Sequence, residues 1–342
     1  MQDGDIIIAD TAEDEAVGKC VEIGNIGDLS IVSGLHTIPC RPKEKFAPAY
    51  LGFYLNSASY HDQLIPLMQG IKVTSISKSA ISDTMILAPT TLSEQGKIGQ
   101  FFTQLDSLIT LHQRELKKLQ TLKKSMLEKM FPQKGASVPQ LRFHGFTDAW
   151  EQRKLGDLME ITSVRRIHQS DWTDSGVRFL RARDIVAVSK NEEVSEPLFI
   201  SQEKYDEYSA LSGKLKIGDL LVTGVGTIGV PMLINSEEPL YFKDGNIIWF
   251  KNENRIDGRF FYYSFNGSFI QNFITESSGT GTVGTYTIEN GKKTPINLPV
   301  QKDEQEKIGA FFSKLDSLIT LHQRELKKLQ ILKKSLLQKM FA

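Results

Sequence analysis

Two long segments, 97–131 and 307–341, carry the same pattern of apolar and polar residues. In the first segment, apolar side chains recur at intervals of three, four and seven residues, a period that places them along one side of an α-helix. Beyond Gly99 and Gly309 neither segment contains Gly or Pro, and both are rich in good helix formers. The pattern therefore predicts two long helices, each with one apolar stripe suited to pairing with another helix. The stripe of the first comprises Leu105, Ile109, Leu116, Leu119, Met126 and Met130.

The two segments are nearly identical in sequence. They differ at six of 35 positions, numbered 100, 103, 104, 121, 126 and 128 in the first copy, and their offset is 210 residues. At about 1.5 Å per residue such a helix is roughly 50 Å long. Matching apolar faces within one chain favour an antiparallel pair, since the long intervening segment lets the second helix return along the first. A coiled coil between two chains is the alternative that the helices alone leave open.

The duplication extends beyond the helices. Gly4–Ile8 resembles Gly218–Val222, and Tyr50–Asn56 resembles Phe260–Asn266. A β-like run ends at Pro89 before the first helix and at Pro299 before the second. Nothing in the first copy matches residues 150–216, so we expect its module to lack about 65 residues at the front.

Short β-like runs mixed with one or two helices predict α+β modules. Residues 132–149 are rich in Pro, Gly and polar residues and are typical of a linker. We therefore expect a partial first module, a first long helix, a linker, a second module and a second long helix. Their expected bounds are 1–92, 93–131, 132–149, 150–300 and 301–342.

The composition limits the possible partners and the compartment. The chain has 41 basic and 41 acidic residues, so DNA binding must depend on local patches or on other subunits. Cys20 and Cys40 provide neither a disulfide framework nor a zinc-binding set, which favours a reducing compartment. No apolar run approaches a membrane span, and the polar start is unlike a signal peptide. We expect a cytoplasmic protein that does not engage a membrane.

A cluster of arginines between residues 164 and 183 is the strongest candidate for DNA contact. The segment contains five arginines and only two aspartates. The planar guanidinium group of arginine can bind both phosphates and the edges of guanine bases. The alternative is that these arginines pair with neighbouring acids on a solvated face. The candidate DNA-binding residues here are Arg165, Arg166, His168, Arg178, Arg181 and Arg183.

Two loops add weaker candidates. Gly224–Gly229 fits the GxGxxG pattern, but the β-like run that follows replaces the helix that a dinucleotide site requires. We expect a strand-to-strand loop that brings Thr227 close to DNA. In the first module, Lys72, Thr74, Ser75 and Lys78 combine lysines and hydroxyls that commonly contact phosphates, although such loops are also ordinary surface.

The sequence lacks the motifs of the main catalytic alternatives. It contains no GxxxxGK[ST] phosphate loop, no HExxH, no GxSxG elbow and no Asn-Pro-Pro-aromatic tetrapeptide. His112 and His322 lie within the helical stripes and are expected to pack rather than bind metal. We therefore predict a non-catalytic protein without a cofactor or metal.

The chain resembles the specificity subunits of type I restriction–modification systems over nearly its whole length. The resemblance is carried by Leu141–Gly156 (LRFHGFTDAWEQRKLG), Arg181–Ile185, Gly224–Gly229, and Leu105–Arg114 with its copy. It implies two target recognition domains separated by antiparallel spacer helices that form a coiled coil. Each domain would recognise half of a bipartite double-stranded DNA site, and the helix length would set the gap.

The resemblance also implies partners. Modification (methyltransferase) subunits docked on the helices would methylate adenine, and a restriction subunit with a translocase motor would cleave DNA. The expected gap at the front of the first recognition domain departs from the family pattern. It leaves open a recombined or fragmentary gene, a misassigned start, or completion by a second specificity chain. A non-productive fragment and a purely structural coiled-coil scaffold are the alternative functions.

Overall fold

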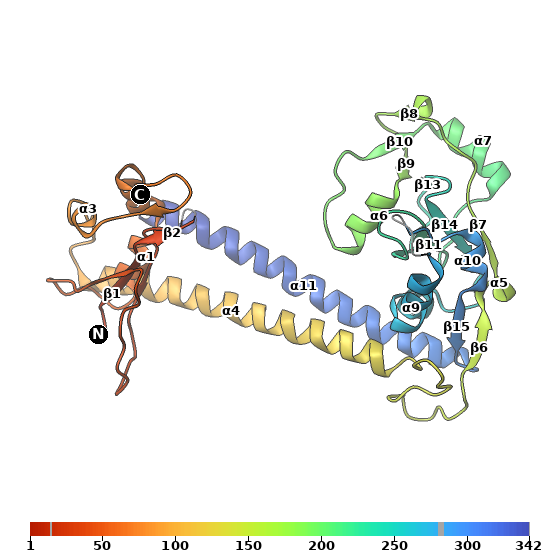
Figure 1. The fold of residues 1–342 in the computed structure, drawn as a ribbon, viewed down its shortest axis with the longest axis horizontal. Coiled ribbons are helices and arrows are strands. Elements are labelled where there is room, and N and C mark those ends of the chain that lie inside the picture. Colours follow the sequence, from red (N-terminus) through yellow and green to blue (C-terminus); the bar gives the residue numbers. More distant parts are fainter. Residues whose placement is uncertain (14–15, 280–283, 342) are drawn as a thin grey trace. The chain divides into compact units, whose positions relative to one another are not determined.

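The computed structural model describes residues 1–13, 16–279 and 284–341 (Figure 1). The chain forms two compact units, which we call unit 1 and unit 2. Unit 1 comprises residues 1–118 and 320–342, and unit 2 comprises residues 119–319. Each unit thus contains one module together with parts of both long helices.

The two predicted helices are α4 (Leu92–Lys129) and α11 (Lys302–Met340). In unit 1, Asp106 of α4 pairs with Lys333 of α11 at 2.5 Å, and the Nδ1 atoms of His112 and His322 lie 3.0 Å apart. In unit 2, Lys123 pairs with Asp316 at 2.6 Å. Residue numbers rise along one helix as they fall along its partner, which confirms the antiparallel pair.

Unit 1 is built on a three-stranded antiparallel sheet of order β3-β1-β4. Short helices and the start of α4 cover it, and its core includes Ile6, Ile8, Tyr50, Phe102 and Phe341. The strands are β1 (Ile6–Ala9), β2 (Thr11–Ala12), β3 (Cys20–Glu22), β4 (Thr37–Cys40) and β5 (Thr74–Ser75). The helices are α1 (Tyr50–Leu55), α2 (Ala58–Leu64), η1 (Ile65–Leu67) and α3 (Lys78–Ser82).

Unit 2 contains two four-stranded sheets, of order β12-β11-β14-β7 and β13-β9-β10-β8, and the pair β15-β6. Its strands are β6 (Glu151–Lys154), β7 (Glu160–Thr162), β8 (Trp172–Thr173), β9 (Val177–Leu180), β10 (Leu198–Ile200), β11 (Leu220–Thr223), β12 (Pro231–Leu233), β13 (Leu240–Phe242), β14 (Ile247–Lys251) and β15 (Pro295–Leu298). Its helices are α5 (Leu155–Leu158), η2 (Gln169–Asp171), α6 (Ala182–Ser189), α7 (Gln202–Ser212), α8 (Gly258–Asn266), α9 (Ser268–Ser277) and α10 (Ile288–Lys293).

Strand pairing confirms that the modules are duplicated. In unit 1, Ile6 of β1 pairs with Cys40 of β4, and in unit 2 Leu220 of β11 pairs with Phe250 of β14. The order β3-β1-β4 therefore corresponds to β12-β11-β14. Unit 2 adds β7 on the free side of β14 and carries the second sheet as well.

A junction between each long helix and its own module is also repeated. The buried Gln95 accepts a hydrogen bond from the backbone of Ala47 at 3.0 Å and donates one to Pro89 O at 2.8 Å. Its counterpart, Gln305, makes equivalent hydrogen bonds to Asp257 and Pro299.

A glycine follows one turn after the glutamine in each helix. A Cβ at Gly99 would lie 2.5 Å from Pro48 O, and one at Gly309 would lie 2.8 Å from the amide nitrogen of Phe260. Backbone thus packs directly on backbone at both junctions.

The segment predicted as a linker is irregular, but it packs on the start of α11. Arg142 forms a bidentate ion pair with the buried Glu304 at 2.6 and 2.8 Å. Phe143 packs edge-on against Phe311, and Lys307 lies over the ring of Phe146. The linker is therefore part of the fold of unit 2. Among the described helices, none is long and apolar enough to cross a membrane.

Removal of Arg142 should destabilise unit 2 strongly. Glu304 is 1% exposed, so Arg142→Ala leaves a buried carboxylate without its partner, at an expected cost of about 3–5 kcal/mol. Chemical denaturation measures this change. The control is Arg153→Ala, because Arg153 is 48% exposed and its loss should cost within about 0.5 kcal/mol. Similar losses in both variants would contradict the structural role of the buried pair.

The stability of unit 1 should depend on pH through Asp5. Two hydrogen bonds of 2.7 Å from Arg41 hold the pKa of Asp5 at about 2, below its ordinary 3.8. A lowered folded-state pKa stabilises the protein above pH 4, and this stabilisation is lost as the pH falls towards 2. Arg41→Gln should raise the pKa of Asp5 and flatten the pH dependence in that window. NMR titration of the Asp5 carboxyl measures this, and an unchanged midpoint in the variant would refute it.

Candidate nucleic-acid interface

Two adjacent parallel strands bring basic residues to one edge of unit 2. Leu180, at the end of β9, pairs with Phe242, at the end of β13, and Lys243 donates its backbone N–H to Leu180 O at 2.8 Å. Residues that follow the two strands therefore lie side by side. Arg181, Arg183 and Lys243 follow these strands, and Arg166, on the loop after β7, joins them through its ion pair with Asp244. We define the arginine edge as these four residues and the adjacent Arg165.

A buried carboxylate organises part of the arginine edge. Asp184 is 1% exposed and accepts the backbone N–H of Arg181, which caps the start of α6. Its oxygens lie 3.1 Å from Arg181, 4.0 Å from Arg178 and 3.9 Å from Arg183. Three guanidinium groups thus lie within 4.0 Å of one carboxylate. Because three positive charges surround one negative charge, the cluster is positively charged.

Arg178 and Arg181 are held mainly by the protein itself. Arg178 is 23% exposed and donates to Leu198 O at 2.9 Å, and burial lowers the pKa of its guanidinium. Arg181 is 20% exposed and donates to Glu196 O at 2.8 Å. The observed contacts of Arg178 and Arg181 agree with the alternative interpretation, in which the arginines pair with neighbouring groups of the protein. Their contact with DNA stays a prediction.

Arg165, Arg166 and Arg183 present their guanidinium groups to solvent. Arg166 is 65% exposed and pairs with Asp244 at 2.9 Å, and Arg183 is 54% exposed and pairs with Glu196 at 3.1 Å. Arg165 lies over the ring of Tyr208 at 5.3 Å. Because an ion pair at the surface contributes little energy, Arg183 can exchange Glu196, which is 82% exposed, for a phosphate.

His168 comes two residues after Arg166. It precedes η2, which leads into β8. Trp172 of β8 pairs with Ile200, which pairs with Val177 at the start of β9. The side chain of His168 is exposed, and its contact with DNA stays a prediction.

The glycine-rich segment connects two strands, as predicted, because β11 and β12 form an antiparallel hairpin. Gly229 closes the turn by donating its N–H to Thr223 O at 2.8 Å, and Thr227 is exposed within it. Positive φ angles of 71° at Gly226 and 75° at Gly229 explain why glycine occurs at these two places. No helix follows to hold a pyrophosphate, so the structure does not support a dinucleotide site.

The hairpin loop is attached to the loops that carry the exposed arginines. Gly224 donates its N–H to Asn246 O at 2.8 Å and accepts one from Tyr286 at the same distance. Ser163, two residues before Arg165, accepts the N–H of Gly245 at 3.4 Å. A cavity of about 430 Å³ lies between these loops. Thr227 and the two adjacent arginines thus belong to neighbouring loops.

The loop at 243–246 was not among the candidates predicted from the sequence. Lys243 extends the basic character of the edge, and Asp244 holds Arg166. The sequence Lys-Asp-Gly-Asn between two apolar runs is a turn signal that would have located this loop. Its position beside Arg181 follows from the parallel pairing of β9 and β13, which no local pattern reveals.

The four candidates of unit 1 lie in one continuous segment. Lys72 is exposed before β5, Thr74 and Ser75 form β5, and Lys78 begins α3. Ser75 exchanges backbone hydrogen bonds with Gln69 at 2.8 and 2.9 Å, which fixes the turn between them. The segment presents two lysines and two hydroxyl groups within seven residues.

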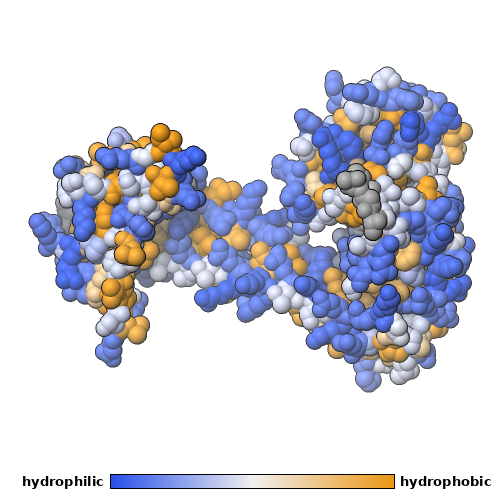
Figure 2. Space-filling view, viewed as in Figure 1, coloured by the Kyte–Doolittle hydropathy of each residue, from blue (hydrophilic) through white to orange (hydrophobic). Residues whose placement is uncertain are grey.

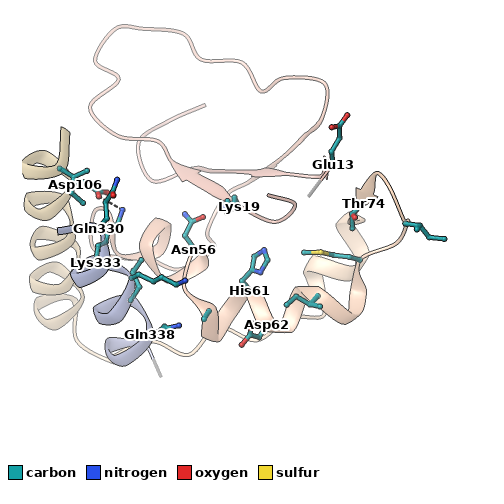
Figure 3. A pocket seen from close by; sticks show the side chains of 17 residues that line it. Glu13, Lys19, Asn56, His61, Asp62, Thr74, Asp106, Gln330, Lys333 and Gln338 are labelled. Carbon is teal, nitrogen blue, oxygen red and sulfur yellow. Dashed lines mark ion pairs between the residues drawn. The ribbon is translucent and has the colours of Figure 1, made fainter. Parts of the chain in front are cut away.

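Thr74 also lines a cavity of about 1000 Å³ in unit 1 (Figure 3). Other polar groups around this cavity already have partners: Asp106 pairs with Lys333, and His61 contacts Val17 O at 2.9 Å. The figure shows Thr74 far from the Asp106–Lys333 pair. We therefore find no convergent binding chemistry in this cavity. Across the described residues, no group of three or more His, Cys, Asp or Glu side chains is arranged to hold a metal ion.

Comparison with known proteins connects the arginine edge to a family. Residues 147–330 match the family model "Type I restriction modification DNA specificity domain". The chain is 26% identical over 288 residues to the type I restriction enzyme MjaVIII specificity subunit of Methanocaldococcus jannaschii, covering 79% of this chain and 64% of that protein. It is 29% identical over 166 residues to a putative specificity subunit of Haemophilus influenzae, covering 48% and 40%. The chain thus spans less than two thirds of either relative.

A solved structure shows the same fold. The S subunit of a type I restriction–modification system from M. genitalium aligns with 99% of this chain and 83% of its own length. The TM-score is 0.68 and the sequence identity is 14%. At this identity the likeness establishes the architecture, and it does not assign residues to DNA contacts.

Proposed function

The chain belongs to the type I restriction–modification DNA specificity family, and from this premise we propose that unit 2 binds double-stranded DNA through the arginine edge. The observation that carries the proposal is the exposure of three guanidinium groups within the matched region, those of Arg165 and Arg166 on the loop after β7 and that of Arg183 in the first turn of α6. Arg183 pairs with Glu196, which is 82% exposed, so a phosphate can replace this partner at little cost, whereas Arg166 pairs with Asp244, which is 14% exposed.

The arrangement separates residues that contact DNA from residues that position them. Arg165 and Arg166 are adjacent, exposed and able to contact successive phosphates or a guanine edge. Thr227, on the neighbouring hairpin loop, supplies a hydroxyl and closely approaching backbone. Arg178 and Arg181, held around Asp184, act in this proposal as positioning residues that keep α6 and Arg183 in place.

The wider role is that of a specificity subunit within a larger complex. Modification subunits would methylate adenine at the site that this chain selects, and a restriction subunit with a translocase motor would cleave DNA. Unit 1 would contact a second half-site through Lys72, Thr74, Ser75 and Lys78. The length of α4 and α11 would then determine the gap between half-sites. In this role the chain provides recognition and the partners provide catalysis.

Replacing both adjacent arginines should weaken DNA binding and its salt dependence together. Arg165→Ala/Arg166→Ala should lower affinity for duplex DNA about 10- to 100-fold and reduce the slope of log K against log [salt] by about 2, since each phosphate contact contributes roughly 0.9. Fluorescence anisotropy over a salt series measures both quantities. The control is Arg153→Ala/Lys154→Ala, an adjacent basic pair on β6. Equal behaviour of the two double variants would refute the arginine edge as the DNA site.

Methylation mapping tests the role in the complex. Co-expression with the cognate modification subunit should produce methylated adenines within a two-part motif, and the Arg165/Arg166 double variant should abolish them. A one-part motif would restrict recognition to one unit. Absence of methylation by the unmodified chain, despite a stable complex, would favour a structural scaffold.

A further inference from the structure

Arg165 differs from the other exposed arginines of the arginine edge in what its guanidinium group contacts. Arg166 pairs with Asp244 at 2.9 Å, and Arg183 pairs with Glu196 at 3.1 Å. Within the part of the chain that the structure describes, the guanidinium group of Arg165 has neither an acidic partner nor a hydrogen-bond acceptor. The side chain is exposed, so its N–H donors are free for a ligand.

The ring of Tyr208, on α7, supports the guanidinium group of Arg165. The Cζ atom of Arg165 lies 5.3 Å from the centroid of this ring. The Nζ atom of Lys204, one turn earlier on α7, lies 4.8 Å from the same centroid and pairs with Glu207 at 3.1 Å. An aromatic face attracts a guanidinium group without occupying its N–H donors. The ring therefore restrains Arg165 and leaves its hydrogen-bonding capacity unused.

The backbone of Arg165 is also fixed. Its N–H donates to Ser212 Oγ at 3.0 Å, and its carbonyl oxygen accepts a hydrogen bond from Tyr241 Oη at 2.9 Å. Tyr241 is 2% exposed and belongs to one core cluster with Ile167, which is 1% exposed. The loop after β7 is thus attached to the core of unit 2 on both sides of the exposed arginine pair.

A guanidinium group with a fixed position and free donors suits base recognition. A phosphate contact requires positive charge, which arginine and lysine both supply. The O6 and N7 atoms of guanine require two N–H groups in one plane, which arginine supplies when its side chain is held in place. The visible face of unit 2 in Figure 2 is mainly hydrophilic, which agrees with a charged ligand rather than an apolar partner.

We propose that Arg165 binds the O6 and N7 atoms of a guanine in the major groove, and that Tyr208 is the positioning residue that holds its guanidinium group for this contact. The inference rests on the proposed function, because it assigns a particular role to one member of the arginine edge. On a duplex without the preferred base pair, the same guanidinium group contacts phosphate, since non-specific binding requires charge alone. Arg165 therefore contributes both to affinity for any duplex and to the choice of one base pair.

Arg165→Lys separates these two contributions, because lysine keeps the charge and lacks the planar fork. Selection of duplexes with a randomised core by the full chain, followed by sequencing, should reveal a position at which the unmodified chain prefers guanine. In the variant this preference should fall at least about 5-fold, as expected for loss of a bidentate contact. Its affinity for non-specific duplex and its slope of log K against log [salt] should stay the same. The control is Arg153→Lys, the same change at an exposed arginine of β6, which should keep the preference.

Two variants of Tyr208 test the positioning role. Tyr208→Leu should lower the preference for guanine about 2- to 5-fold, the effect expected for an exposed cation–π contact. Its salt slope should not change, because the net charge is the same. Tyr208→Phe should retain the preference, since it keeps the aromatic face. A merely structural role of Tyr208 would instead reduce binding to all duplexes equally.

Three results would overturn the proposal. The first is that Arg165→Lys selects the same sequences as the unmodified chain, or that the unmodified chain selects no guanine. The second is an equal loss of affinity for all duplexes in Arg165→Lys, which would make Arg165 a phosphate contact. The third is equal behaviour of Tyr208→Leu and Tyr208→Phe. Failure of the proposed function gives a different result, in which the Arg165→Ala/Arg166→Ala chain binds non-specific duplex as tightly as the unmodified chain.

Discussion

The junction between a long helix and its own module is the interaction on which both units depend. Gln95 and Gln305 satisfy backbone groups that the junction buries, and Gly99 and Gly309 allow backbone to approach where a Cβ would clash. Each junction is completed by the far end of the other helix. Phe341 packs on Phe102 in unit 1 with ring centroids 5.6 Å apart, and Phe131 packs on Phe312 in unit 2 at 5.9 Å. Unit 1 is therefore formed by two separate stretches of chain, whereas unit 2 is the continuous stretch 119–319 and contains the end of α4 and the start of α11.

The sequence predicted the parts of the fold that depend on local periodicity and on repetition. The helical period identified both long helices, and their near identity implied an antiparallel pair, since matching apolar faces in one chain can bury each other. The hairpin around Gly226 and Gly229 was also predictable, because proline in the following run argued against a helix. Sheet order was not predictable. The pairing of β9 with β13 joins residues more than 60 positions apart and follows from packing of the whole unit.

For the candidate site, composition located the arginine cluster but did not separate its members. Arg181 and Arg183 are neighbours in sequence with equal formal charge, yet one is 20% exposed and the other 54%. The difference follows from Asp184, whose carboxylate is buried because it caps α6. A charge of opposite sign three residues away is visible in the sequence, whereas its burial is a property of the tertiary fold.

The two copies of the junction also show what the segment 142–162 contributes. Identical helix residues are covered in unit 2 and exposed in unit 1, so the difference in exposure arises from the surrounding chain and not from the helix sequence. Glu304 can remain buried because Arg142 neutralises it, whereas Glu94 retains its hydration. The same holds for Ile296, which β6 covers, and Ile86, which faces solvent.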